Sequence, residues 1–264
     1  MNKEVLKNKC IYFLALSSMC LVLAFVAYLF FLRQIDVNVM TNAQFQYIGE
    51  NGGASLKVIN ATNDLNQRTQ EFMESVVYEV SPNTNLSNGD IVHVKATYSH
   101  EVAEQYHFHP THIEQDFVVE GLNDRYENIE DIDKDYLKNI QQSCKDYIKK
   151  HQNQIYQLDG EDQKSERLVN QKVVYSAFLK SKTTKSSDRY IEMYELQYEM
   201  NDTKDTILYV VCVPEINDGN IVQIQDIYGE KAYLNEEEMN QEAYGNYINR
   251  VFANKYDIEV YEKE

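Results

Sequence analysis

Residues 10–32 read CIYFLALSSMCLVLAFVAYLFFL, a run of 23 consecutive positions without a charged side chain. An α-helix rises about 1.5 Å per residue, so this run is long enough to cross a hydrocarbon core of about 30 Å. A core helix of a globular protein normally carries a polar face, which this run lacks. The sequence therefore predicts a transmembrane helix over residues 10–33, ended by Arg33.

The charges that flank this helix predict its orientation. Lys3, Lys7 and Lys9 precede it, whereas after Arg33 no further Lys or Arg follows until Lys57. Positively charged flanks stay preferentially in the cytoplasm. We therefore expect a short cytoplasmic tail, residues 1–9, and an extracytoplasmic location for the bulk of the chain.

Two other interpretations of the same segment are open. A secretory signal peptide also starts with basic residues and an apolar stretch, but that stretch usually spans about 7–15 residues and ends at a small-residue cleavage site. Here the run is longer, and Val37–Met40 offers no such site. Lipid attachment at Cys20 would place Met19 where a small residue is expected. An uncleaved signal anchor is the prediction.

The charge balance limits the partners. Outside residues 1–33 the chain holds 21 Lys and Arg against 41 Asp and Glu, a formal charge of −20. Such a surface repels phosphate backbones, so we expect no nucleic-acid partner. Cationic partners are compatible with it, as is an acidic face that contacts only solvent.

Residues 40–122 have the pattern of a β-rich domain. Val92, Val94 and Ala96 alternate with polar residues, which is typical of a half-buried strand. Asn-Gly turns adopt positive φ at little cost and mark the strand ends. Ser99 is a candidate N-cap for a short helix. Five or six short strands predict an immunoglobulin-like β-sandwich.

The C-terminal part predicts a second domain over residues 134–264, after an acidic linker over 123–133. Its pattern is an amphipathic helix, an antiparallel meander and a final helix that starts at Asn235, which makes the whole chain an α+β protein. The four predicted strands cover residues 172–179, 190–200, 206–213 and 221–228.

Both predicted helices carry an apolar stripe. We expect the final helix to pack across the meander, beside the first helix, because such a stripe does not remain in water on a monomeric domain. The stripe of the first helix comprises Tyr136, Leu137, Ile140, Cys144, Tyr147 and Ile148. That of the final helix comprises Met239, Ala243, Tyr247, Ile248, Val251 and Phe252.

Four short motifs resemble a group of proteins of Gram-positive bacteria. They are YIGENGGA at 47–54, YEVS at 78–81, NLSNGD at 85–90 and FVVEGL at 117–122. Together they resemble membrane-anchored extracytoplasmic proteins, many of which carry a cytoplasmic zinc ribbon before the transmembrane helix. The resemblance implies β-rich external domains and no known catalytic residues. The zinc ribbon is absent from residues 1–9, since Cys10 has no CxxC partner.

Three histidines form the one cluster that suggests metal binding. His107 and His109 would share a face of a strand, with His112 close behind and Glu114 or Asp116 as a fourth ligand. The competing interpretation is a polar loop around Pro110. We assign no metal, cofactor or catalytic residue, and this segment supports only the alternative function below.

The cysteines and tyrosines leave further alternatives open. Cys144 and Cys212 could form a disulfide or be two small buried residues. The sequence does not decide between these. The tyrosines of the predicted strands could form a ligand-binding face or simply a strand core, and the core interpretation is favoured. They are Tyr190, Tyr194, Tyr198 and Tyr209.

These observations predict a non-enzymatic binding protein. We expect a single-pass membrane protein whose external domains bind a cell-envelope component or a partner protein, because no G-x-S-x-G or comparable catalytic motif follows the anchor. The alternative is a small envelope hydrolase or metal-dependent enzyme built around His107–His112. Neither the identity of the partner nor the oligomeric state follows from the sequence.

Overall fold

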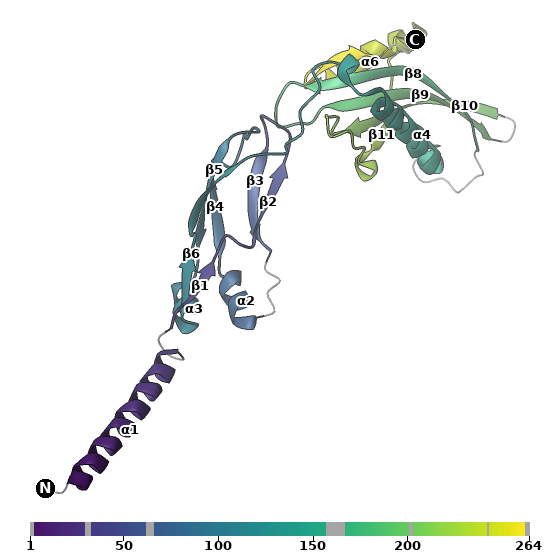
Figure 1. Cartoon of the computed structure of the whole chain (residues 1–264). Helices are drawn as coiled ribbons and strands as arrows, with labels where there is room; N and C mark the ends of the chain where they lie inside the picture. The colour runs from purple at the N-terminus through teal and green to yellow at the C-terminus, as the bar shows by residue number, and fades with distance from the viewer. Residues whose placement is uncertain are drawn as a thin grey trace. The chain divides into compact units, whose positions relative to one another are not determined.

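The computed structural model describes residues 3–29, 33–61, 66–156, 167–200, 203–241 and 243–261. Helix α1, Lys3–Ala27, includes the 21-residue apolar segment Lys7–Ala27, which is not buried and is long enough to cross a membrane. Residues 30–32 of the predicted span lie outside the described residues. The chain divides into two compact units (Figure 1).

The first unit contains residues 1–46, 56–83 and 91–117, and the second contains 47–55, 84–90 and 118–264. The chain therefore passes between the units several times. The second unit includes three segments that the sequence assigned to the sandwich domain (40–122) or to the linker (123–133). These are residues 47–55, 84–90 and 118–133.

The first unit consists of small sheets and two short helices, and some of its strands extend into segments of the second unit. Strand β1 (Ile35–Asn38) pairs in parallel with β6 (Phe108–Thr111), β2 (Ala43–Ile48) pairs with β3 (Ser55–Asn60), and a third sheet has the order β4-β5-β7. That sheet comprises β4 (Val77–Ser81), β5 (Ile91–Thr97) and β7 (Glu114–Val118). The helices are α2 (Gln67–Glu74) and α3 (His100–Gln105).

Two local predictions for this unit are confirmed. On β5 the side chains of Val92, Val94 and Ala96 are buried and their neighbours are exposed. Ser99 caps α3, because its hydroxyl accepts a hydrogen bond from the backbone N–H of Val102. The strands form three small sheets, and an immunoglobulin-like two-sheet sandwich is not confirmed.

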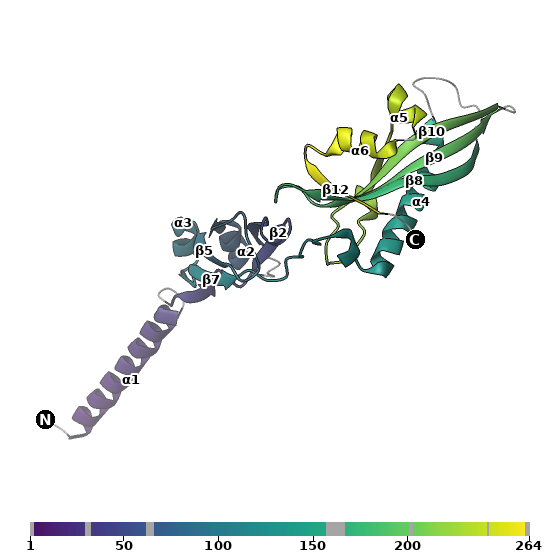
Figure 2. The ribbon, with the colours of Figure 1, turned by 90° about the horizontal axis from the view of Figure 1, so that it is seen from above.

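The second unit is built on a five-stranded antiparallel sheet in the order β11-β10-β9-β8-β12. The strands are β8 (Arg167–Ser181), β9 (Arg189–Met200), β10 (Thr203–Pro214), β11 (Tyr228–Lys231) and β12 (Tyr256–Val260). Helix α4 (Lys134–Tyr156) packs on one face, and α6 (Tyr244–Phe252) packs on the other (Figure 2).

Strand β9 shows why both faces of this sheet are covered. Tyr190 and Tyr194 point into the core beneath α4, whereas Ile191 and Met193 point into the core beneath α6. Successive side chains of a strand alternate between the faces, so apolar residues at both sets of positions require a layer on each side. The sequence prediction that the two helices lie beside one another is therefore wrong.

Two further expectations for this unit are wrong. The predicted final helix is divided into α5 (Glu236–Asn240) and α6, because Ala243 leaves helical dihedral angles at φ −83° and ψ 57°. The fourth strand does not cover 221–228. It begins only at Tyr228, since residues before it form a loop with a 3₁₀ turn at Ile224–Asp226.

Candidate functional site

Helix α4 positions the candidate site. Its buried side is the predicted stripe, now comprising Tyr136, Leu137, Ile140, Cys144, Ile148 and Ile155. With this side fixed against the sheet, the helical period directs other residues toward the neighbouring loop 221–227. The loop itself is held by Ile227, which is buried in the same core.

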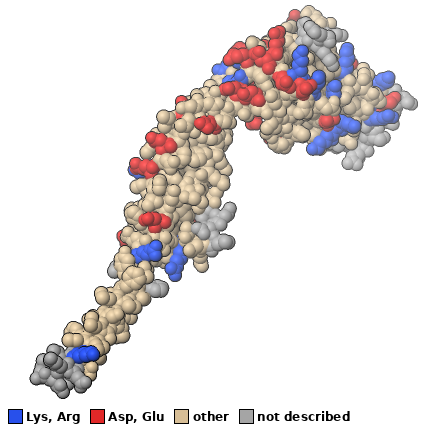
Figure 3. All heavy atoms as spheres, in the orientation of Figure 1, with Lys and Arg blue, Asp and Glu red and all other residues tan. Residues whose placement is uncertain are grey.

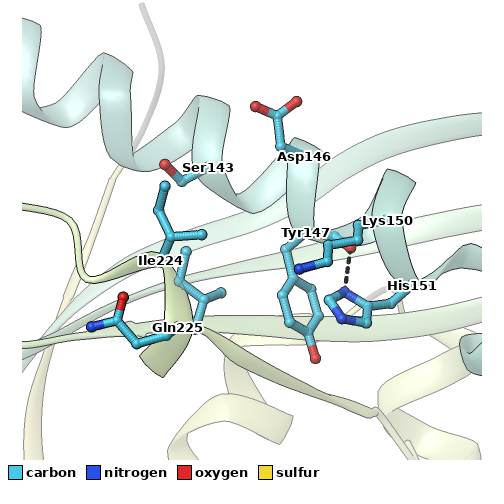
Figure 4. A pocket seen from close by; sticks show the side chains of 8 residues that line it. Ser143, Asp146, Tyr147, Lys150, His151, Ile224 and Gln225 are labelled. Carbon is cyan, nitrogen blue, oxygen red and sulfur yellow. Dashed lines mark hydrogen bonds between the residues drawn. The ribbon is translucent and has the colours of Figure 1, made fainter.

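A groove of about 270 Å³ lies between α4 and this loop. Figure 4 shows Ile224 and Gln225 on one side and Tyr147, Lys150 and His151 on the other. Ile224 is 69% exposed, which is high for so apolar a side chain. Ser143, Asp146 and Ile227 complete the lining. The groove therefore offers apolar, aromatic and charged groups to one ligand.

The two aromatic side chains of the groove hold each other in place. The rings of Tyr147 and His151 lie with centroids 4.2 Å apart. His151 Nδ1 lies 2.8 Å from the backbone oxygen of Tyr147, one helical turn earlier. A carbonyl oxygen only accepts, so Nδ1 carries the proton and donates. In the neutral imidazole, Nε2 is then an acceptor for a ligand.

Serine, histidine and aspartate all line this groove, but they do not form a catalytic triad. Ser143 and His151 are eight residues apart on one straight helix, about 12 Å along its axis. A nucleophile and its base need hydrogen-bond contact, and the base needs its second nitrogen oriented by a third group. Here His151 Nδ1 is bonded to a backbone carbonyl.

A second polar cluster in the same unit was not predicted. Arg125 donates two hydrogen bonds to the fully buried carboxylate of Asp188 and others to the carbonyl oxygens of Ser181 and Thr183. Glu50 lies 3.6 Å from Arg125 and accepts a hydrogen bond of 2.9 Å from Asn217. The network connects segments far apart in sequence.

Burial shifts the pKa of one carboxylate of this cluster, Glu50. The pKa of Glu50 is raised, first by burial and then by the charges of Asp188 and Glu215, although Asn217 and Arg125 act in the opposite direction. The cluster is a structural junction rather than an open site.

The motifs that carry the family resemblance meet near this junction. The Asn88 side chain exchanges two hydrogen bonds with the backbone of Leu122, at 2.8 and 3.0 Å. Asn51 accepts a hydrogen bond from the Asn88 backbone, and Ala54 forms a bridge with Leu86. Residues of the motifs 47–54, 85–90 and 117–122 thus contact one another within the second unit.

The predicted histidine cluster does not assemble. Across the described parts of the chain, no group of three His, Cys, Asp or Glu side chains could hold a metal ion. His109 instead pairs with Asp36 at 2.9 Å, and both side chains are exposed. His107 and His112 adopt left-handed backbone angles, each with φ 55°, on either side of β6.

Cys144 and Cys212 are free and buried. They belong to the cores on opposite faces of the sheet, Cys144 beneath α4 and Cys212 beneath α6. The pKa of each thiol is raised, chiefly by burial, so neither is an activated nucleophile. They are small core residues, and the disulfide alternative is not found.

The strand tyrosines are core residues, as favoured above. Tyr190, Tyr194 and Tyr198 are at most 1% exposed, and Tyr209 is 7% exposed. Burial raises the pKa of Tyr198 to about 12. Their hydroxyls are used within the fold, as when Tyr198 donates to the backbone oxygen of Gln152 at 2.9 Å.

No protein-family model, no curated protein and no solved structure matches this chain.

Proposed function

We propose that this chain is a single-pass membrane protein whose second unit lies outside the cytoplasm and binds a cell-envelope component or a partner protein without enzymatic chemistry. The groove beside α4 is the observation that carries the proposal. The apolar helix α1 supports the membrane anchor, and the resemblance of residues 47–122 to anchored extracytoplasmic proteins supports the location.

The lining of the groove favours recognition of a folded or extended partner. A single exposed apolar residue is ordinary on a protein surface. Ile224, however, projects beside a hollow whose other wall is the Tyr147–His151 ring pair. Apolar area in the centre with polar groups around it is the usual composition of a binding site.

The charged rim indicates the chemistry of the partner. Lys150 and Asp146 follow one another along the groove on α4, and His151 Nε2 can accept a hydrogen bond when the imidazole is neutral. We expect the partner to insert an apolar side chain against Ile224 and to place polar groups of both signs at the rim. Such groups give orientation more than affinity.

Site-specific photo-crosslinking in intact membranes tests the proposal. A benzophenone amino acid replaces Ile224 in the groove or, as a matched control, Tyr233, which is 77% exposed in the same unit but outside the groove. We expect a defined adduct from position 224 only. The adduct should weaken when Lys150→Glu reverses the charge of the rim.

Equal adducts from both positions, or a yield from position 224 that Lys150→Glu leaves unchanged, would contradict binding at this groove. No adduct from position 224 would contradict it as well.

A further inference from the structure

A cavity in the first unit lies between two strands that each form the edge of a sheet. Its volume is about 570 Å³, and it is lined by residues 56–60 of β3, by residues 76–80 at β4 and by Asn83. Among the described strands, β3 pairs only with β2, and β4 is the outer strand of the β4-β5-β7 sheet (Figure 1). The cavity is therefore a slot between two open strand edges, which we call the edge slot.

Hydrogen bonds join the two sides of the edge slot at both of its ends. At one end the backbone N–H of Leu56 donates to the carbonyl oxygen of Asn83 at 3.0 Å. At the other end the Asn60 side chain donates to the backbone oxygen of Met73, which precedes β4 in the chain. These contacts hold β3 and β4 in place on either side of the cavity, so the slot is formed without a ligand.

The backbone of β3 offers hydrogen-bonding groups to the edge slot. The N–H of Leu56 points toward the β4 side, since its acceptor Asn83 follows β4 in the chain. The backbone groups of alternate residues in a strand point to the same edge, so those of Val58 face the slot as well. An edge strand holds an added strand by such main-chain groups. A strand in this slot would have an edge of a sheet on each side.

The side chains around the slot specify the pattern of such a strand. Val58 is buried, and Tyr78 and Val80 are half-buried, whereas Lys57 and Glu79 are exposed. One face of the slot therefore lies over apolar side chains and the other lies toward solvent. Since side chains alternate along a strand, the occupant needs apolar residues at every second position and polar residues between them.

Two observations favour a different protein over a second copy of this chain. Every strand of the described residues already pairs within a sheet, so a second copy offers no described strand with both edges free. Residues beyond 33 also carry a formal charge of −20, which repels another copy and favours a segment without negative charge.

We propose that the edge slot binds an extended, non-acidic segment of a partner protein, which is added as a strand between β3 and β4. The segment is recognised by its backbone on both edges and by the alternation of its side chains. The edge slot shares no residue with the groove beside α4, so either site can fail without the other.

Synthetic peptides test backbone recognition on the detergent-solubilised full chain. The probe is a fluorescent nine-residue peptide in which valine alternates with lysine or threonine, and its binding is measured by anisotropy. Two matched controls carry N-methyl groups, one on every valine and the other on every lysine and threonine. Each control keeps the charge and the side chains but loses the N–H donors along one edge. Because the slot has two edges, we expect each control to bind about tenfold more weakly or worse.

Amide-resolved hydrogen exchange locates the bound probe. Saturating peptide should slow the exchange of the Val58 amide about tenfold or more, and amides of β4 should also gain protection. The matched control regions are β11 and β12, which are the outer strands of the five-stranded sheet and do not face a second open edge. We expect no change in their exchange.

Weaker binding of both N-methylated peptides, together with protection of β3 and β4, supports the proposal. It is overturned if the probe does not bind, or if either N-methylated peptide binds as well as the probe, since pairing would then involve one edge at most. Equal protection of β11 or β12 overturns it too, because the peptide would then add to any sheet edge. A chain that self-associates through β3 and β4 without peptide would assign the slot to a second copy and likewise overturn the proposal.

Discussion

At the scale of single residues, Arg125 connects distant segments of the second unit. It satisfies the buried Asp188 with two hydrogen bonds and ties down the Ser181 and Thr183 carbonyls. The carboxylate of Glu50 lies 3.6 Å from Arg125 and is stabilised much less by it than Asp188 is. Glu50 is therefore a carboxylate whose ionisation this fold opposes.

The pH dependence of stability should reveal Glu50. Its folded pKa is raised above the ordinary value of 4.5, so the folded chain binds this proton more tightly than the unfolded chain. Its contribution to stability therefore grows as pH falls through the folded pKa and levels off below 4.5. Relative to Glu50→Gln, the melting temperature of the full-length wild-type chain should rise as the pH is lowered from neutral toward 4.5.

Asp135→Asn is the matched control. The hydrogen bond and charge of Lys138 lower the pKa of Asp135 below 3.8, so its contribution stays constant above that value and is lost only at lower pH. The difference in melting temperature between the wild-type chain and Asp135→Asn should stay constant over the pH range in which the difference for Glu50→Gln changes. A flat Glu50→Gln difference, or one of opposite sign, would falsify the assignment.

Residues whose partners are close in sequence were predictable, and those with distant partners were not. Ser99 reaches a backbone N–H three residues later. The capping box of Asn235 and Glu238 is also local, and the predicted helix start at Asn235 is confirmed. Arg125 instead pairs with Asp188, 63 residues away, from an acidic segment without periodicity. No pattern in 123–133 could show that pair.

At the scale of elements, the two helices of the second unit differ in how they use their apolar stripes. Helix α4 buries its stripe over six turns, largely as the spacing predicts. The final stripe is only partly used, because Ile248 is fully buried whereas Met239 is 60% exposed on the separate α5. The periodicity alone could not show where the helix is interrupted, since a continuous helix and two short ones share the same spacing.

Truncation of α6 measures how firmly it packs. Ile248→Ala should lower the free energy of unfolding by about 2–5 kcal/mol, through lost transfer energy and the cavity left behind. Met239→Ala, in the same stripe but exposed, should change it by less than about 0.5 kcal/mol. Chemical denaturation of the solubilised full chain gives both values. If Ile248→Ala left the unfolding curve unchanged, α6 would be a docking element and not part of the core.

At the scale of the whole molecule, charge is distributed very unevenly along the chain. Helix α1 is uncharged along most of its length, with basic side chains near its N-terminal end (Figure 3). Residues beyond 33 carry a formal charge of −20. Basic flanks on one side of an apolar helix bias its insertion, whereas acidic residues contribute little. The proposed orientation therefore depends on three lysines, Lys3, Lys7 and Lys9.

Protease treatment of intact protoplasts tests this orientation in the membrane. We expect added protease to remove the chain beyond about residue 40 and to leave a short stub, because α1 would be protected by the bilayer. Replacing Lys3, Lys7 and Lys9 together by Ala should increase the protected fraction. Lysed protoplasts serve as the control, since digestion there must be complete in every orientation.

An N-terminal epitope tag distinguishes an uncleaved anchor from a cleaved signal peptide. An anchor keeps the tag on the membrane with the stub, whereas cleavage releases a chain that lacks both tag and helix. Protection of the acidic bulk in intact protoplasts would contradict the proposed topology and place the groove beside α4 in the cytoplasm.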